Sequence, residues 1–281
     1  MRPMTTLSQK DKAIQFRALH AGPAILILPN AWDAASACIF QQAGFPAIAT
    51  TSSGVAASLG YPDGEQISRE MLVEVVKRMT RVVECPVTVD TEAGYGDTIE
   101  EVLQTVKAII DAGAVGINIE DSTKQQEKAL VEVSYQVEVI KAIRQLAESM
   151  DLSLVINART DVFLLAIGDP ASRFEHAVQR ANAYREAGAD CLFPIGVSDA
   201  STIENLAKAI NGPINIAAGF TTLSISELAQ LGVARVSFAS GLMRATLGYL
   251  RSIAHEVLEH GTYTRVTENA ISGKEFRSLF A

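Results

Sequence analysis

One repeated pattern constrains the fold of this chain more than any other feature. A short apolar run, a polar or glycine-containing break and a longer segment of helical periodicity follow one another, and this unit recurs eight times before residue 260. Each apolar run has the length of a buried strand and is too short for a helix. Strands that alternate with helices favour a parallel sheet joined by right-handed crossovers. Eight such units predict a (β/α)8, or TIM, barrel.

The pattern assigns each element to a segment of the chain. The expected strands are at residues 25–28, 47–50, 87–89, 116–119, 154–157, 191–194, 214–217 and 236–239. The expected helices are at residues 11–20, 33–43, 69–83, 98–111, 132–149, 171–187, 200–210, 224–231 and 241–259. Two long connections, 52–68 and 121–131, follow strand ends where barrel enzymes keep their sites. Because no linker interrupts the pattern, we expect one domain, with the barrel at about 20–260 and a tail at 261–281.

Net charge, the length of apolar runs and cysteine spacing indicate which partners and which cellular location to expect. The net charge is -8 and no basic cluster is interleaved with aromatic residues, which argues against binding to nucleic acid or to an anionic membrane. No apolar run reaches the roughly 18 residues that a membrane span requires, and residues 1–17 do not resemble a signal peptide. The three cysteines are far apart, as is typical of reduced, buried thiols. We therefore expect a cytoplasmic protein that acts on small molecules.

The segment Val87-Thr88-Val89-Asp90-Thr91-Glu92 carries two carboxylates to the carboxyl end of an expected strand. Residues two apart on an extended chain lie on one side, so Asp90 and Glu92 would face the same way. Carboxylates this close repel each other unless a proton or a cation lies between them. The segment therefore favours a site for a hard cation. The alternative is a pair of solvated loop acids.

Polar side chains also follow the other expected strands and would converge on one mouth of the barrel. They are Asn30, Asp33, Thr51, Ser52, Ser53, Asp63, Asp90, Glu92, Glu120, Asp121, Arg159, Asp161 and Asn215. Several carboxylates with one arginine suit a divalent cation and an anionic substrate. The structural alternatives are that Asp121 or Asp161 caps the following helix and that Arg159 only neutralises the acids.

Other catalytic arrangements lack their residues. The four histidines lie in helical or peripheral segments, so neither a histidine zinc site nor a Ser-His-Asp triad has evident partners. The chain has no Walker loop and no Gly-x-Gly-x-x-Gly after a strand. No lysine at a strand end offers a Schiff base. Metal-assisted stabilisation of an enolate, formed from a 2-oxo or 2-hydroxy acid chelated to Mg²⁺, remains the chemistry that the residues favour.

Four motifs in this order carry a resemblance to a known family. They are Thr51-Ser52-Ser53 with Leu59-Gly60-Tyr61-Pro62-Asp63, Asp90-Thr91-Glu92-Ala93-Gly94-Tyr95-Gly96, Gly116-Ile117-Asn118-Ile119-Glu120-Asp121, and Asn157-Ala158-Arg159. Together they resemble the isocitrate lyase / phosphoenolpyruvate mutase superfamily over about residues 20–260. The resemblance implies a TIM barrel and chemistry through an enediolate-type intermediate of pyruvate.

The resemblance also implies roles for individual residues. Asp90 would bind Mg²⁺ directly, with Mn²⁺ as the alternative ion, while Glu92 and Glu120 would reach the ion mostly through water. Asp63 would lie beside the metal as a catalytic residue, and Arg159 would hold the substrate carboxylate and take part in catalysis. The expected substrate-binding residues are Thr51, Ser52, Ser53, Arg159 and Asn215, with Ser52 and Ser53 acting through backbone N–H groups.

Relatives in this superfamily exchange a C-terminal helix between subunits of dimers that pair into tetramers. The tail of this chain contains a short helix-like segment at residues 273–280, with Phe276, Leu279 and Phe280 on one face. The resemblance therefore implies a subunit-swapped C-terminal helix and a homodimer or homotetramer.

The chain departs from the family pattern where the leaving group is handled. Lyases of the family carry a Lys-Lys/Arg-Cys-Gly-His motif after strand four, but residues 121–130 contain no cysteine and lack the asparagine of the mutases. Ala49 replaces an aromatic residue, and Pro194-Ile195-Gly196 replaces the segment in which mutases have a histidine. Lys124 or Glu127 would be the substitutes for the missing acid.

These features support a Mg²⁺-dependent lyase that cleaves a C–C bond, or a P–C bond, in a small 2-oxo or 2-hydroxy carboxylic acid. Decarboxylation or a retro-aldol reaction fits best, because loss of CO₂ needs no protein acid on the leaving group. Two alternatives remain open: a non-catalytic protein that binds the metal and a carboxylate, and a mutase or hydrolase of phosphonopyruvate.

Overall fold

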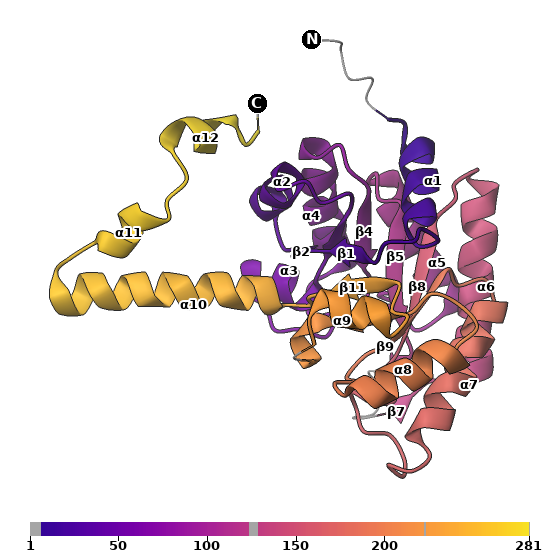
Figure 1. Cartoon of the computed structure of the whole chain (residues 1–281). Helices are drawn as coiled ribbons and strands as arrows, with labels where there is room; N and C mark the ends of the chain where they lie inside the picture. The colour runs from indigo at the N-terminus through magenta and orange to yellow at the C-terminus, as the bar shows by residue number, and fades with distance from the viewer. Residues whose placement is uncertain (1–6, 124–128, 222, 281) are drawn as a thin grey trace.

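The computed structural model describes residues 7–123, 129–221 and 223–280, and its parallel strands are surrounded by helices (Figure 1). The parallel strands are β1 (Leu26–Leu28), β2 (Asn30–Ala31), β3 (Ile48–Thr50), β4 (Val87–Asp90), β5 (Gly116–Glu120), β8 (Val155–Thr160), β9 (Cys191–Pro194), β10 (Asn215–Ala217) and β11 (Arg235–Ser237). Each expected strand is therefore present, with ends that differ by a few residues.

Two sheets join to close the barrel. One has the order β2-β3-β4-β5-β8-β9 and the other the order β1-β11-β10. Pro29 separates β1 from β2 because it has no N–H to donate, but its carbonyl still accepts a hydrogen bond from the Ala49 N–H at 2.9 Å. A bridge between Leu192 and Ile214 joins β9 to β10. With β1 and β2 taken as one strand, eight parallel strands of the described chain form the predicted TIM barrel.

Helices follow the strands in the expected order. They are α2 (Ala34–Gln42), α3 (Ser52–Ser58), α4 (Arg69–Val82), α5 (Ile99–Asp111), α6 (Val133–Ser149), α7 (Arg173–Glu186), α8 (Ala200–Ala209), η1 (Ala218–Phe220), α9 (Ile225–Gln230) and α10 (Gly241–His255). Their buried apolar residues and those of the strands belong to one large hydrophobic cluster. This packing fixes the ends of neighbouring strands relative to one another.

The two long connections contain structure that the sequence pattern did not predict. Helix α3 lies within the segment 52–68, and the Thr51 hydroxyl caps it by accepting a hydrogen bond from the Gly54 N–H. After β5, the antiparallel strands β6 (Ser122–Thr123) and β7 (Ala129–Leu130) form a short ribbon. Lys124 and Glu127 lie outside the described residues. Both connections follow the carboxyl ends of strands, so they lie at the barrel mouth.

Helix α1 (Gln9–Leu19) closes the opposite end of the barrel. The Gln9 side-chain amide donates hydrogen bonds to the carbonyls of Ile110 and Ala114, at 2.7 and 2.9 Å. Phe16 is fully buried and reaches the Gly116 backbone at the start of β5. The end of the barrel that carries the strand amino termini is therefore sealed, and the other end is left for a site.

The C-terminal segment extends away from the barrel. Helix α10 runs outwards and continues into the π-helical segment Glu256–His260, followed by α11 (Thr264–Glu268) and α12 (Gly273–Ser278) (Figure 1). The predicted tail helix is present, but its apolar face is not continuous. Phe276 is 61% exposed, whereas Leu279 is only 7% exposed and belongs to the buried cluster of the barrel. None of the helices in the described part of the chain has both the length and the apolarity to cross a membrane.

The contact between α1 and β5 makes a testable prediction for stability. A Cβ added at Gly116 would lie 2.7 Å from Phe16 Cε1 and 2.8 Å from Thr88 Oγ1. We expect Gly116→Ala to lower the free energy of unfolding by about 1–3 kcal/mol, because the buried neighbours must shift. Gly219→Ala is the control, since no atom lies within 4 Å of its added Cβ. Equal urea midpoints for the two variants would contradict the proposed packing.

Candidate functional site

Asp90 is the last residue of β4, and the backbone around it aims its carboxylate at the mouth. Its N–H donates to the Thr50 hydroxyl at 2.8 Å, and its Oδ2 accepts the Ser52 N–H at 3.1 Å. Its Oδ1 is buried and has no hydrogen-bond partner among the described residues. A buried carboxylate oxygen without a partner is costly. Asp90 therefore offers one oxygen to a ligand.

Glu92 is held beside Asp90 by an unusual backbone conformation. Its φ of 49° lies in the left-handed region, which is uncommon for a residue other than glycine. The Glu92 carboxylate accepts the Glu65 N–H at 2.7 Å and the Tyr95 hydroxyl at 2.9 Å. Burial, and then the negative charge of Asp90, raise the pKa of Glu92 to about 8. Without a cation, Glu92 therefore holds a proton at neutral pH.

Asp63 belongs to the same group of acids. It lies at the exposed rim of the mouth, in the connection between α3 and α4. Partial desolvation, and then the charge of Asp90, raise its pKa, while the Ser52 side chain opposes this shift by hydrogen bonding. Asp90 is thus close enough to Asp63 and Glu92 for its charge to disfavour the ionisation of both.

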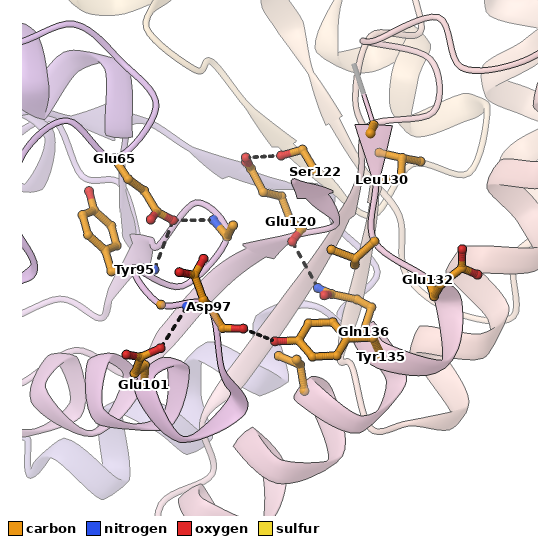
Figure 2. A pocket seen from close by; sticks show the side chains of 15 residues that line it. Glu65, Tyr95, Asp97, Glu101, Glu120, Ser122, Leu130, Glu132, Tyr135 and Gln136 are labelled. Atoms are coloured by element: carbon orange, nitrogen blue, oxygen red, sulfur yellow. Dashed lines mark hydrogen bonds between the residues drawn. The ribbon is translucent and has the colours of Figure 1, made fainter. Parts of the chain in front are cut away.

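Arg159 is fixed between two carboxylates at the ends of neighbouring strands. Its Nη1 lies 2.7 Å from Glu120 Oε2, across the register pair Glu120 and Arg159 of β5 and β8. Its Nε and Nη2 donate to the two oxygens of Asp161 at 2.6 and 2.9 Å. The Ser122 hydroxyl donates to Glu120 at 2.6 Å (Figure 2). Arg159 does neutralise acids, as the structural alternative proposed, and it is held in one orientation by them.

The helix-capping alternative for Asp121 and Asp161 is wrong. Helix α6 begins after Glu132 and helix α7 begins after Ser172, so neither aspartate is a cap. Asp121 is instead completely buried and accepts hydrogen bonds from groups on α7 and from the Asp161 N–H.

The expected substrate-binding residues do not all point towards Asp90. The Ser52 N–H, expected to contact substrate, donates to Asp90, and the Thr51 hydroxyl is used as the cap of α3. Ser53 is half-buried in the first turn of this helix. Asn215 is fully buried, and its amide donates to the Ser237 hydroxyl at 3.0 Å. Among the described residues, no hydrogen bond links Asn215 to Asp90 or Arg159.

Two further polar residues of the expected mouth are structural. Asp33 caps α2 by accepting the Ser36 N–H at 2.7 Å. Asn30 is buried, and its amide donates to the Thr50 carbonyl at 2.7 Å and accepts the Phe238 N–H at 2.7 Å. The Asn30 bonds join neighbouring strands at the mouth, and the Asp33 bond begins α2. The described contacts therefore give neither side chain a role in binding.

A cavity of about 770 Å³ lies beside Glu120, between the loop after β4 and helix α6 (Figure 2). Glu65 lies on one wall, where its Oε1 accepts the N–H groups of Ala93 and Tyr95 at 3.0 and 3.1 Å. Together with the bond from its own N–H to Glu92, this fixes the loop that follows Asp90. Sequence analysis did not single out Glu65, because nothing in the sequence pattern pairs it with a loop about 30 residues further on.

The donor set fits a hard divalent cation such as Mg²⁺. Asp90 Oδ1 is the buried oxygen without a partner among the described residues. The carboxyl groups of Asp63, Glu92 and Glu120 lie near it, and burial, with the charge of Asp90 as a further cause, raises their pKa values. Within the described ranges, no group of three or more aspartate, glutamate, histidine or cysteine side chains is arranged to hold a metal ion. Mg²⁺ commonly binds through one or two carboxylates and keeps several waters, so this partial set suits it.

The fold places a group of acidic side chains at the mouth of a TIM barrel, and comparison with known proteins gives the family. The phosphoenolpyruvate phosphomutase family profile matches residues 16–258. The 2-methylisocitrate lyase of Escherichia coli K12 is 32% identical over 264 residues, which cover 90% of this chain and 86% of that protein.

Solved structures agree with this relationship. A Burkholderia cenocepacia J2315 structure, described only provisionally as a lyase/mutase, has a TM-score of 0.90 and 37% identity and covers 97% of this chain and 96% of its own. The structure of 2,3-dimethylmalate lyase, at 24% identity and a TM-score of 0.83 over 99% of this chain and 95% of that chain, shares the fold. The chain belongs to the phosphoenolpyruvate phosphomutase family, within the phosphoenolpyruvate mutase/isocitrate lyase superfamily, and is an enzyme of this group of lyases and mutases.

The raised pKa of Glu92 predicts how a cation stabilises the protein. The carboxyl has an ordinary pKa of 4.5 and a folded value of about 8, so the metal-free folded state keeps a proton that the unfolded chain has released. Raising the pH through this range therefore removes stability in the absence of metal. Mg²⁺ competes with that proton, so we expect the increase in melting temperature caused by Mg²⁺ to grow between about pH 6 and about pH 8.5.

The control for this measurement is Glu92→Gln, which keeps the size of the side chain and cannot ionise. Its Mg²⁺-induced shift in melting temperature should depend less on pH than that of the wild-type protein. A wild-type shift that is independent of pH, or an unchanged dependence in the variant, would contradict the role of Glu92.

Proposed function

We propose that this enzyme is a Mg²⁺-dependent lyase that cleaves a C–C bond in a small 2-oxo or 2-hydroxy carboxylic acid. The observation that carries the proposal is the unpartnered, buried Asp90 Oδ1 within a group of mutually repelling carboxylates. Such a group is stabilised when a cation joins it. The similarity to 2-methylisocitrate lyase supports the lyase class, while the substrate of this chain is part of the proposal.

Asp90 is the residue that would hold the ion directly, with Glu92 and Glu120 reaching it through water. Bound Mg²⁺ would supply electrostatic stabilisation of negative charge on the oxygen next to the substrate carboxylate. Mn²⁺ would serve the same residues. The pKa of Glu92 makes this binding dependent on pH, because the ion and the proton compete for the same group of carboxylates.

Arg159 would bind the substrate carboxylate. A guanidinium group has five N–H bonds, and three of those on Arg159 donate to Glu120 and Asp161, so two remain outside the described contacts. Because two carboxylates fix its plane, Arg159 would meet a substrate without losing further side-chain entropy. It would also offset the negative charge of an enolate formed during cleavage.

Asp63 is our candidate for proton transfer. Partial desolvation and the charge of Asp90 raise its pKa, and its position at the rim gives it access to a bound substrate. A carboxyl whose pKa lies closer to neutrality is a better general acid or base. Asp63 would therefore protonate the enolate or remove the proton from a 2-hydroxy group. Thr51, Ser52 and Ser53 would line the substrate side of the mouth near it.

The expected reaction is a decarboxylation or a retro-aldol cleavage. The loop after β5 has no cysteine in its sequence, which is the acid or base that the resemblance leads us to expect in family lyases. Loss of CO₂ leaves the electron pair on the pyruvate-like part of the substrate and needs no acid on the departing group. The site then has only to hold the carboxylate, stabilise the enolate and protonate it.

A turnover screen tests this proposal. Purified protein is assayed with Mg²⁺ and with EDTA against oxaloacetate, 2-methylisocitrate, dimethylmalate and phosphonopyruvate. We expect metal-dependent release of pyruvate or another C–C cleavage product, lowered at least about 100-fold in Asp90→Ala, since that variant removes the ligand oxygen. Asp33→Ala, which removes a carboxylate that only caps α2, is the matched control and should keep its activity.

The other outcomes distinguish the alternatives. Turnover of phosphonopyruvate alone would contradict C–C cleavage and support phosphonate chemistry. Metal-dependent binding of oxalate without turnover of any compound would favour a binding protein. Equal rates with Mg²⁺ and with EDTA would contradict the metal-dependent mechanism.

The extended C-terminal segment supports a homodimer or homotetramer. Leu250 on α10 is 57% exposed and Leu258 in the following π-helical segment is 86% exposed. Exposed apolar side chains gathered on a projecting element are typical of subunit interfaces. We propose that a second copy of the chain covers them and that α10 and the π-helical segment after it pack on the partner subunit.

This assembly is tested by light scattering after size-exclusion chromatography. We expect the wild-type protein to be a dimer or tetramer, and Leu250→Asp with Leu258→Asp to be smaller, because a charge in an apolar interface is costly. Ile14→Asp is the control, because Ile14 is 59% exposed on α1, away from this segment. A monomeric wild-type protein would contradict the proposed interface.

A further inference from the structure

Asp121 connects helix α7 to the end of β8. Its Oδ2 accepts the Tyr184 hydroxyl at 2.8 Å and Arg180 Nη1 at 3.1 Å, both from α7. Its Oδ1 accepts the backbone N–H of Asp161 at 2.9 Å. The carboxylate is 0% exposed, so its three bonds replace the water that it lost on burial. The position of Asp161 therefore depends on groups in a helix outside the mouth.

Asp161 in turn holds Arg159 through two hydrogen bonds. The side-chain oxygens of Asp161 accept Arg159 Nε and Nη2 at 2.6 and 2.9 Å. A bidentate pair of this kind fixes the plane of the guanidinium as well as its place. A shift of the Asp161 backbone would thus move Arg159. Hydrogen bonds lead in this order from Arg180 to Asp121, Asp161 and Arg159.

Arg180 also fixes the connection that begins at Asp121. Its Nη2 donates to the Val131 carbonyl at 3.0 Å, and the Val131 N–H donates to the Asp121 carbonyl at 2.9 Å. Its Nε donates to His176 at 2.9 Å. The buried Arg180 side chain therefore binds both Asp121 and Val131. These residues begin and end the connection that follows Glu120, so both of its ends are fixed to α7.

We propose that Arg180, acting through Asp121, is the positioning residue for Arg159, and this rests on the proposed role of Arg159 in binding a carboxylate. None of the hydrogen bonds described for Arg180 reaches Asp90, Glu92 or Arg159 directly. Removal of Arg180 would leave the buried Asp121 carboxylate without a cation, so this carboxylate would have to move towards water or another donor. That movement weakens its hold on the Asp161 N–H and releases Arg159 from its fixed orientation.

A second, partly buried ion pair in the barrel provides a control for stability. Arg144 donates to Asp190 at 2.6 Å and to the carbonyls of Gly188 and Leu154, each at 2.7 Å. Leu154 immediately precedes β8 and Asp190 immediately precedes β9, so this pair lies at the opposite end of the barrel from Arg159. Arg144→Met removes a comparable set of contacts without a connection to the mouth.

The test is a double-mutant cycle for oxalate binding in the presence of Mg²⁺, measured by calorimetry on the full chain. We expect Arg180→Met to weaken oxalate binding about tenfold in the wild-type background, the loss of a charge-assisted contact. In an Arg159→Met background it should change binding by less than about twofold, because the residue through which it acts is gone. Arg144→Met should change binding by less than about twofold in both backgrounds.

A rescue variant adds a readout that a general loss of stability would not produce. Asp121→Asn together with Arg180→Met leaves a neutral amide whose oxygen can still accept the Asp161 N–H. We expect this double variant to bind oxalate more tightly than Arg180→Met alone. If Arg180→Met does not fold, Arg180→Gln replaces it under the same criteria, because it also removes the positive charge beside Asp121 while keeping a polar side chain.

Each outcome decides the proposal. Equal losses of affinity from Arg180→Met in both backgrounds, or no loss in the wild-type background, would overturn the positioning role and leave the proposed function intact. Failure of the wild-type protein to bind oxalate with Mg²⁺ would overturn the proposed function, and the positioning role with it.

Discussion

Repulsion among the carboxylates around Asp90 is the constraint on which the site depends. Burial and neighbouring charge raise the pKa values of Asp63 and Glu92, and one oxygen of Asp90 is left without a described partner. A fold does not keep such a group without a stabilising counter-charge. Arg159 supplies one positive charge, but Glu120 and Asp161 already bind it. A divalent ion would compensate for the remainder, and the same charges would then hold an anionic substrate through the ion.

The barrel stabilises this arrangement of charge because backbone hydrogen bonds and strand register hold the carboxylates in place. Register pairing places Glu120 beside Arg159 on neighbouring strands, so the ion pair follows directly from the sheet. Helix α1 seals the far end of the barrel, and the left-handed conformation of Glu92 turns its side chain towards Glu65 and Tyr95. The chemistry would thus be carried by strand ends and the connections that follow them, while the remainder of the chain holds those ends in place.

The fold and part of the site were predictable because they depend on local pattern. Strand-length apolar runs and helical periodicity identified the barrel, and the position of Asp90 and Glu92 at a strand end was predictable because they follow an apolar run directly. Contacts between distant residues were not predictable in this way. Nothing near Glu65 points to the loop after Asp90, and nothing near Arg180 or Tyr184 points to Asp121, because these partners meet only after the helices pack. The same limit applies to Leu279, which shares its expected apolar face with Phe276 and Phe280 but is buried while they are exposed.

The measurement that tests the central claim most directly is an anomalous-scattering map from crystals grown with Mn²⁺ and oxalate. The account predicts a manganese peak within bonding distance of Asp90 Oδ1, with the oxalate between that ion and Arg159. It also predicts that the peak is lost in crystals of Asp90→Ala. A map without a peak at Asp90, or a peak only at another surface position, would contradict the claim that the acidic mouth of this barrel binds the metal.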